Sequence, residues 1–204
     1  MKGDDAMQNK QEMYHVGKQA GYVWTWWQGD ALPKLPEVAH WHVESSDNVA
    51  LAAKISNLTI GNTEERYEQG HRPYMAYVEQ ELVAYGWSAV RNAAFGSPNV
   101  NFYVAGHNLY LYHFVTMLPW RGRGCYPRLL QEIIRRTQQD YERFWIIHQL
   151  SNQASQKGIA KAGFSIANSV FHLDHAGLGL VAGEDTARAQ AGAQLLGLPL
   201  VTFP

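Results

Sequence analysis

The sequence contains a single cysteine, Cys125, among its 204 residues. An internal disulfide framework is therefore excluded, and this cysteine usage is typical of a reducing compartment. No apolar run reaches the ~18 residues that a membrane-spanning helix needs. The first eleven residues also lack the apolar core of a signal peptide. We therefore expect a soluble, cytoplasmic protein with no membrane partner.

An excess of charge of one sign is also missing. The 17 Lys and Arg residues are balanced by 18 Asp and Glu residues, so the net charge is −1. This balance argues against a nucleic-acid partner bound over a whole surface. The hydrophobic content of 46% is ordinary for a globular protein. A chain of this length can bury the core of one domain without disulfides or metals.

Segments with strand and helix patterns alternate along the chain, which predicts a mixed α/β fold. We expect strands at 22–27, 40–43, 74–79, 82–90, 109–117, 144–148 and 164–173, and helices at 49–58, 63–69, 127–139 and 152–161. Residues 93–99 have the composition of a loop, and the tail predicts a weak helix at 184–196 and a strand-like end at 199–203.

Three regions follow from this pattern. Residues 1–20 form a polar N-terminal arm, which we expect to be loose or helical, and residues 21–173 form the main domain. The tail, 174–204, is expected to pack on that domain or to extend the sheet edge of a partner. Such an edge allows a homodimer, which the sequence does not decide.

Two arginines and two glycines separate a predicted strand from a strong amphipathic helix, in the segment Arg121-Gly122-Arg123-Gly124. Glycines let the backbone approach a ligand closely, and the helix N-terminus presents unpaired N–H groups. This combination suits a pyrophosphate. A P-loop is excluded because Gly-Lys-Ser/Thr is absent, and a dinucleotide fingerprint fits poorly because its third glycine is replaced by Pro127.

The segment from Arg121 to Tyr126 resembles the R/Q-x-x-G-x-G/A motif of the GNAT superfamily, the acyl-CoA-dependent N-acyltransferases. A second family signature is similar to the stretch from Asn152 to Gly163-Phe164, where an Asn begins a small-residue helix that ends in Gly-Phe. The resemblance covers roughly residues 40–173. It implies a central, mostly antiparallel sheet flanked by helices.

The resemblance also implies direct transfer of an acetyl or other short acyl group from acetyl-CoA, or a related acyl-CoA, to an amine of a small molecule or protein. The strand end would offer backbone groups to the pantetheine arm, the glycine-rich loop would hold the pyrophosphate, and the Asn would fix the pantetheine or the strand. These implied cofactor-binding residues are Val115, Thr116, Met117, Arg121, Gly122, Arg123, Gly124, Cys125, Tyr126 and Asn152.

Two positions depart from the family pattern. Tyr126 stands where the motif ends in a small residue, and Ile159 stands where many members place a tyrosine acid. These departures leave two alternatives open. One is a non-catalytic module that binds or senses CoA. The other is an acyltransferase with a carrier-bound or long-chain acyl donor.

The candidates for acid or base lie on the strand before the motif, at Tyr110, Tyr112 and His113. A tyrosine titrates near 10, so it suits an acid or a group that orients water. A histidine has the intrinsic pKa of a base. Because side chains alternate along a strand, His113 is expected on the face opposite Tyr112 unless a bulge intervenes.

Three further expectations concern aromatic, thiol and imidazole groups. Rings in the N-terminal half are expected to line the acceptor side, namely those of Trp24, Trp26, Trp27, Trp41, Tyr74 and Trp87. Cys125 lies beside two arginines that would lower its pKa, although a small apolar filler is the favoured interpretation. His40 with His42, and His172 with His175, are too few ligands for a typical metal site, so no metal is expected.

Overall fold

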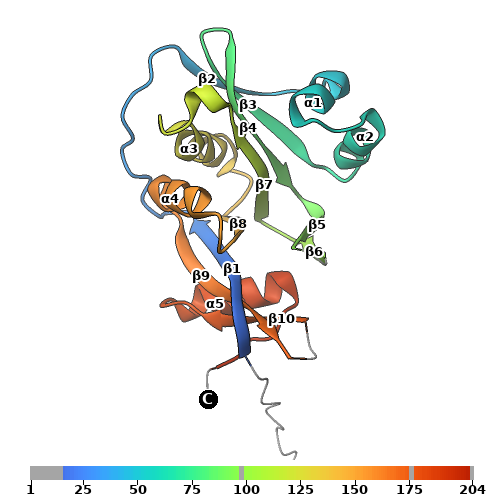
Figure 1. Ribbon diagram of the computed structural model, residues 1–204, viewed down its shortest axis with the longest axis vertical. Helices are drawn as coiled ribbons and strands as arrows, with labels where there is room; N and C mark the ends of the chain where they lie inside the picture. Colours follow the sequence, from blue (N-terminus) through green and yellow to red (C-terminus); the bar gives the residue numbers. More distant parts are fainter. Residues whose placement is uncertain (1–15, 97–98, 175–176, 203–204) are drawn as a thin grey trace, which may run out of the picture.

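The computed structural model describes residues 16–96, 99–174 and 177–202. Its main feature is an eight-stranded sheet in the order β10-β9-β1-β8-β7-β4-β3-β2, with β5 and β6 as a separate pair (Figure 1). Neighbouring strands are antiparallel except β7 and β8, which are parallel. The strands are β1 Val16–Trp27, β2 Trp41–Ser45, β3 Arg72–Val78, β4 Glu81–Ala89, β5 Arg91–Phe95, β6 Val100–Val104, β7 Asn108–Thr116, β8 Arg143–Gln149, β9 Ser165–Leu173 and β10 Gly177–Ala182.

Helices cover both faces of this sheet. The helices are α1 Val49–Ser56, α2 Ile60–Glu68, α3 Cys125–Thr137, α4 Gln153–Ala162 and α5 Thr186–Leu196, with a 3-10 turn at Leu118–Trp120. One core cluster joins α3 and α4 to the sheet, a second joins α5, and a third lies beneath α1. On β8, Phe144 and Ile146 enter the α3–α4 core, whereas Trp145 between them enters the α5 core. The faces therefore alternate as a strand requires.

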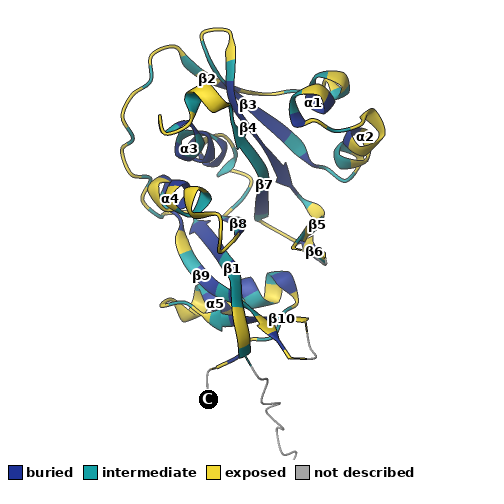
Figure 2. Cartoon of the chain, viewed as in Figure 1, coloured by how far each residue is buried: buried dark blue, intermediate teal, exposed yellow. Residues whose placement is uncertain are grey.

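The helix α3 is the main element packed on its face of the sheet. Its apolar residues Leu129, Leu130, Ile133 and Ile134 recur at helical spacing and are all fully buried (Figure 2). Each such side chain contributes about 1.5–3 kcal/mol by leaving water. The spacing predicted this helix, with a start two residues later than the observed one. The mixed α/β fold is likewise confirmed.

The strand β1 corrects the prediction for the N-terminal region. It begins at Val16, so residues 16–20, predicted as part of a loose or helical arm, belong to a strand, while residues 1–15 lie outside the described part. Its register pairs Tyr22 with both His148 of β8 and Ser169 of β9. A segment from the beginning of the chain is thus an interior strand of the sheet.

Two further predictions were wrong in their local structure. The segment 93–99, predicted as a loop, contributes to the hairpin of β5 and β6, because Ala93 to Phe95 pair with Val100 to Phe102. The turn begins at Gly96, which has a φ of 85°. The tail contains an additional strand, β10, which pairs with β9 from Gly177 onward. Gly177 has a positive φ of 78°. Beyond α5, a single bridge from Leu200 to Leu180 stands in place of the expected strand, and Phe203 lies outside the described residues.

The helix ends follow local signals more closely. α4 begins after Asn152, whose side chain accepts from the Ser155 N–H, and ends at Gly163 with a φ of 102°. Both ends were predicted from these residue types. α2 begins at Ile60, earlier than predicted, because the Thr59 hydroxyl caps it.

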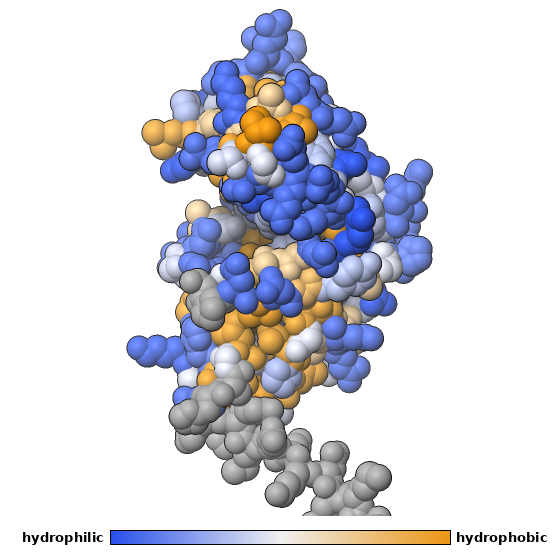
Figure 3. Space-filling model, turned by 90° about the vertical axis from the view of Figure 1, so that its right-hand side faces the viewer, coloured by the Kyte–Doolittle hydropathy of each residue, from blue (hydrophilic) through white to orange (hydrophobic). Residues whose placement is uncertain are grey.

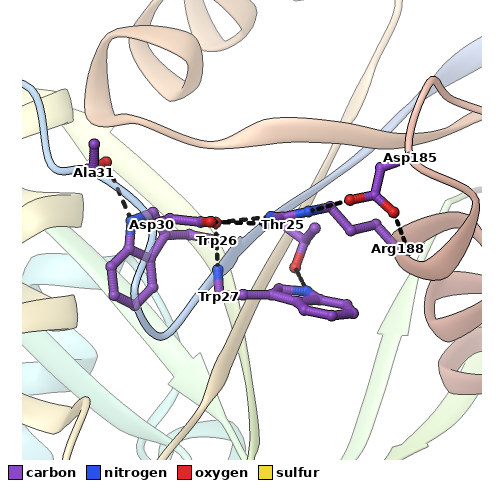
Figure 4. A network of polar contacts seen from close by, with 7 residues as sticks. All are labelled: Thr25, Trp26, Trp27, Asp30, Ala31, Asp185 and Arg188. Carbon is purple, nitrogen blue, oxygen red and sulfur yellow. Dashed lines mark hydrogen bonds and ion pairs between the residues drawn. The ribbon is translucent and has the colours of Figure 1, made fainter.

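An ion pair ties α5 to the turn after β1. Arg188 donates two hydrogen bonds of 2.7 Å to the carboxylate of Asp30, and a third to Asp185 (Figure 4). Asp30 also accepts from the Trp27 N–H at 2.8 Å, and the Arg188 guanidinium lies 4.9 Å from the Trp27 ring. This network joins residues 158 positions apart. A bidentate, partly buried pair of this kind is stronger than an exposed one.

We predict that Arg188→Ala lowers the free energy of unfolding by about 1.5–3 kcal/mol, because it removes charge-assisted hydrogen bonds at a partly buried site. Denaturant unfolding followed by circular dichroism measures this change. Arg136→Ala serves as the matched control, since its 3.9 Å pair with Glu132 is longer and more exposed, and its loss should cost less than about 1 kcal/mol. An equal loss of unfolding free energy in the two variants would contradict a stabilising role for the Arg188–Asp30 pair.

Candidate active site

The strands β7 and β8 separate part-way along their length. Their parallel pairing runs from Asn108 with Arg143 to Leu111 with Ile146 and stops there. Beyond this point β7 stays paired with β4 up to Thr116, and β8 stays paired with β1 up to Gln149. The sheet therefore opens between two strands that are each held from the other side.

A bulge in β7 lies at the start of this opening. The register with β4 shifts between the pairs Trp87–Tyr112 and Tyr85–Val115, and His113 has a φ of 55°. A non-glycine residue in the left-handed region of φ is strained, and it keeps this conformation only where the surrounding structure holds it. The bulge changes the alternation of side chains, so that Tyr112 and His113 both contact Arg66.

A groove of about 570 Å³ lies where the end of β7 meets the N-termini of α3 and α4. Of the residues predicted to bind a cofactor, eight line this groove, namely Val115, Thr116, Arg121, Gly122, Gly124, Cys125, Tyr126 and Asn152. Met117 and Arg123 do not line it. Met117 packs in the core beneath α1, and the Arg123 guanidinium lies 5.1 Å from the Trp120 ring.

The loop before α3 has the features of an anion site. Gly122 and Gly124 have positive φ values of 75° and 79°, and a Cβ at either position would meet nothing within 4 Å. Gly124 is the N-cap of α3 and provides no side-chain cap. No side chain therefore caps the first turn of α3, where the helix dipole favours negative charge. Arg121 is held beside this turn by a hydrogen bond from its Nε to the Thr116 carbonyl.

The sequence reasoning missed two cations in this groove. Lys157 and Lys161 of α4 line it, are exposed, and lie one helical turn apart. Their spacing of four residues on a helix that begins after Asn152 was the available signal. Together with Arg121 they make the groove basic.

Tyr126 packs between the two helices. Its ring lies 5.3 Å from that of Phe114, and its hydroxyl lies 3.2 Å from the Ser155 hydroxyl. A Cβ on Gly158 would come within 2.4 Å of this ring, so a glycine is required there. Burial raises the pKa of Tyr126. The tyrosine at the end of the motif is therefore directed toward α4.

Cys125 is buried, with 2% exposure. Burial raises the pKa of its thiol, and the opposing effects of Arg128 and Arg123 are smaller. The expectation of a lowered pKa was wrong, since burial outweighs the neighbouring charges. The residue is a small apolar filler behind the loop.

Tyr110 lies in the α5 core, with 3% exposure, stacked on Tyr112 at 5.8 Å between ring centroids. Burial raises its pKa strongly. It does not line the groove. These surroundings make Tyr110 a packing residue.

Tyr112 forms a hydrogen-bonded pair with His71, a residue that the sequence reasoning did not single out. The His71 Nδ1 lies 2.6 Å from the Tyr112 hydroxyl, and its Nε2 lies 2.7 Å from the Asn92 carbonyl. A carbonyl can only accept, so Nε2 carries the proton and Nδ1 accepts from Tyr112. Burial lowers the pKa of His71 and raises that of Tyr112.

His113 is held in one tautomer by Arg66. The Arg66 Nη1 lies 3.0 Å from the His113 Nδ1, and since a guanidinium only donates, Nδ1 accepts. Burial and, to a smaller extent, Arg66 lower the pKa of His113. The ring is thus neutral with its proton on Nε2. Its basic nitrogen is already engaged, which disfavours the general-base role.

The predicted aromatic wall does not form. Trp24, Trp26 and Tyr74 lie in the α3–α4 core with Trp41 at its edge, whereas Trp87 lies in the separate core beneath α1. Trp27 stacks with arginines, including Arg143 at 4.4 Å. The rings are distributed over different cores, so the expectation of a shared acceptor surface was wrong.

Within the described residues, no group of three or more His, Cys, Asp or Glu side chains is arranged to hold a metal ion. His175 of the second histidine pair lies outside the described part. Across the same residues, no helix combines the length and apolar character needed to cross a bilayer.

The groove and the opened sheet agree with a comparison of the sequence against known families. Residues 35–164, more than half of the chain, match the acetyltransferase (GNAT) family. The chain belongs to this family. The curated protein sequences contain no match to it.

Solved structures of GNAT acetyltransferases share the fold. One from Colwellia psychrerythraea has a TM-score of 0.55 at 16% identity, over 76% of this chain and 56% of its own. One from Kribbella flavida has a TM-score of 0.52 at 12% identity, over 81% and 61%. A putative one from Novosphingobium aromaticivorans has a TM-score of 0.50 at 15% identity, over 76% and 63%. The chain thus spans less than two thirds of each structure.

We predict that the free energy of unfolding falls as the pH drops below about 6.5. Burial lowers the pKa of His71, His113 and His148 below their usual value of 6.5. The unfolded chain therefore binds more protons below that pH, and stability present above pH 6.5 is lost on acidification. Thermal unfolding between pH 5 and 8 measures this dependence. His71→Gln should make it shallower, whereas replacing the exposed His107 in the same way should not; an unchanged profile in His71→Gln would refute the assignment.

Proposed function

We propose that the protein transfers an acetyl or other short acyl group from acyl-CoA to a primary amine of a small molecule or protein. The observation that supports this best is the basic groove beside the opened strands. There, an uncapped helix N-terminus, two open glycines and Arg121 converge with two lysines of α4. A pyrophosphate needs such a set of donors.

The residues present fit CoA as the donor. The N–H groups at the start of α3 and Arg121 would hold its pyrophosphate, and Lys157 and Lys161 would bind its remaining phosphate. The edge of β7 between Tyr112 and Thr116, which β8 leaves, would bind the amide groups of the pantetheine arm. Acyl-CoA supplies an activated thioester when bound.

The transfer forms one C–N bond and breaks one C–S bond. The amine must lose a proton to attack, and the departing sulfur must gain one. We assign the loss of the amine proton to the Tyr112–His71 pair. The Tyr112 oxygen would take the proton as its own passes to His71 Nδ1, and the Asn92 carbonyl would stabilise the imidazolium that results. The proton would then return from His71 through Tyr112 to the departing sulfur, which leaves as a thiol and restores the neutral pair. His113, neutral with its proton on Nε2, is left as a hydrogen-bond donor.

A non-catalytic CoA-binding module is the second candidate. It is favoured by Ile159, which is fully buried in the α3–α4 core at the position of the family's tyrosine acid. In that case CoA would bind and no amine would be acylated. Turnover with a panel of amines separates the two candidates.

Calorimetric titration with acetyl-CoA tests the groove. Arg121→Ala should weaken binding by about ten-fold to a hundred-fold, since a charge-assisted hydrogen bond contributes about 1.5–3 kcal/mol. Arg123→Ala, two residues away but stacked on Trp120, is the matched control and should change the affinity little. The double variant Lys157→Ala/Lys161→Ala should lose more affinity for CoA than for dephospho-CoA. Absence of binding by the folded wild-type protein would overturn the proposal.

The proton path predicts a distinct kinetic signature. Tyr112→Phe should lower kcat by about 10²–10⁴-fold, the usual contribution of general acid–base catalysis, with KM for acetyl-CoA unchanged. His71 acts through Tyr112 as a positioning residue, so His71→Gln should lower kcat and also shift the pH profile of kcat. His107→Gln is the matched control. A His71→Gln variant with the wild-type pH profile would remove His71 from the path.

A further inference from the structure

A second cavity, of about 640 Å³, lies away from the basic groove. It is bordered by parts of four strands that are neighbours in the sheet and by the β5–β6 hairpin, and it is open to solvent on one side. Its lining comes from Gln19, Ala20 and Gly21 of β1, Ile147 to Ser151 at the end of β8, Val170 and His172 of β9, Gly177 and Leu178 of β10, and Phe95, Gly96, Asn99 and Val100 of the hairpin. Figure 3 shows that the lower part of one side of the molecule carries an extended apolar surface. A volume of this size is typical of small-molecule sites.

The cavity and the groove lie on opposite faces of the sheet. Phe95, Ile147 and Leu178 of the cavity pack against the α5 core, whereas Phe114 and Tyr126 of the groove pack against the α3–α4 core. Consecutive residues of the β8–α4 turn border the two spaces, since Ser151 lines the cavity and Asn152 lines the groove. The opening between β7 and β8 begins after Ile146, directly before the cavity residue Ile147.

The two spaces differ in charge. None of the described residues that line the cavity is Asp, Glu, Lys or Arg, whereas the groove contains Arg121, Lys157 and Lys161. Burial lowers the pKa of His148, one of two cavity histidines, which keeps its ring neutral. A multiply charged ligand would find no counter-charge among these residues, and burying an unpaired charge is costly. The lining therefore suits an uncharged, apolar molecule with a few neutral hydrogen-bonding groups.

We propose that this cavity binds the apolar, uncharged body of the acyl acceptor and directs its single amine toward the opening between β7 and β8. This inference rests on the proposed function and specifies its acceptor as an aryl or alkyl amine without further charges. The exposed rim of the cavity favours an acceptor as its occupant over the acyl chain of a long-chain donor. Gln149, Leu150 and His172 at the cavity are exposed, so a ligand enters from solvent on this face without passing through the groove.

The test uses two related probes, 2-(1-naphthyl)ethanol, which cannot be turned over as an amine, and 2-(1-naphthyl)ethylamine. Calorimetry measures binding of the alcohol, and thiol release from acetyl-CoA measures acylation of the amine. We expect Leu178→Asp to weaken binding of the alcohol at least ten-fold and to lower kcat/KM for the amine by a similar factor. Its affinity for acetyl-CoA should remain unchanged. Spermidine should be a poorer acceptor than the naphthyl amine by at least ten-fold.

Two variants accompany this substitution. Val181→Asp places the same charge on β10, outside the cavity lining, and should bind the alcohol as the wild-type protein does. Val100→Trp fills the cavity from the hairpin side without adding charge, and should weaken binding of the alcohol even if Leu178→Asp does not fold. Thermal unfolding establishes which variants are folded.

The outcomes separate this inference from the proposed function. Binding of acetyl-CoA without binding of the alcohol would overturn the cavity assignment and leave acyl transfer standing. Binding of the alcohol without binding of acetyl-CoA would overturn acyl transfer and, with it, the acceptor role of the cavity. Competition between decanoyl-CoA and the alcohol, absent with acetyl-CoA, would assign the cavity to the acyl chain and overturn the proposal.

Discussion

The separation of β7 from β8 determines where every other feature of the candidate site lies. The parallel pairing ends at Leu111 and Ile146, yet both strands continue because each has a second neighbour, β4 for β7 and β1 for β8. A buried strand edge without a partner is costly, since its backbone groups need hydrogen bonds. The opening is thus a place where a ligand with amide groups can complete the sheet. The groove is lined by Phe114 to Thr116 of β7 and the apolar cavity by Ile147 to Gln149 of β8, so each borders one of the two separated strands.

The strand β1 makes this separation stable. It lies between β8 and β9 and holds the end of β8 away from β7 through the pair Gly21–Gln149. Gly21 is required at this contact, because a Cβ there would lie 2.1 Å from the His148 carbonyl oxygen. The Arg188–Asp30 pair then fastens the end of β1 to α5. A strand that precedes the family-matched segment, 35–164, therefore positions one wall of the site.

The sequence was informative where structure depends on local chemistry. The start of α4 at Asn152, its end at Gly163 and the glycine-rich loop before α3 follow from capping, positive φ and helix dipoles, which neighbouring residues decide. The place of β1 within the sheet depends on pairing with strands more than 100 residues away, which no local pattern specifies. His71 was missed for the same reason. It follows a helix end in the sequence and meets Tyr112 only through the pairing of β3, β4 and β7.

The proposed proton-handling groups lie on the face of the sheet opposite the two positions that depart from the family motif. Ile159 of α4 is buried in the α3–α4 core, so α4 offers no acid at the position where many family members have a tyrosine. Tyr126, on the same side, is engaged with Ser155 and covered by Phe114. The remaining polar hydrogen-bonded groups beside the opening, Tyr112 with His71 and His113 with Arg66, lie on the opposite face, where the bulge brings them together. In the proposed reaction, an amine that is deprotonated by Tyr112 would approach from that face, which is the face of the uncharged cavity. In the proposed reaction, phosphate binding and proton transfer would lie on opposite faces of the sheet, which would keep Arg121, Lys157 and Lys161 of the groove apart from the amine before it loses its proton.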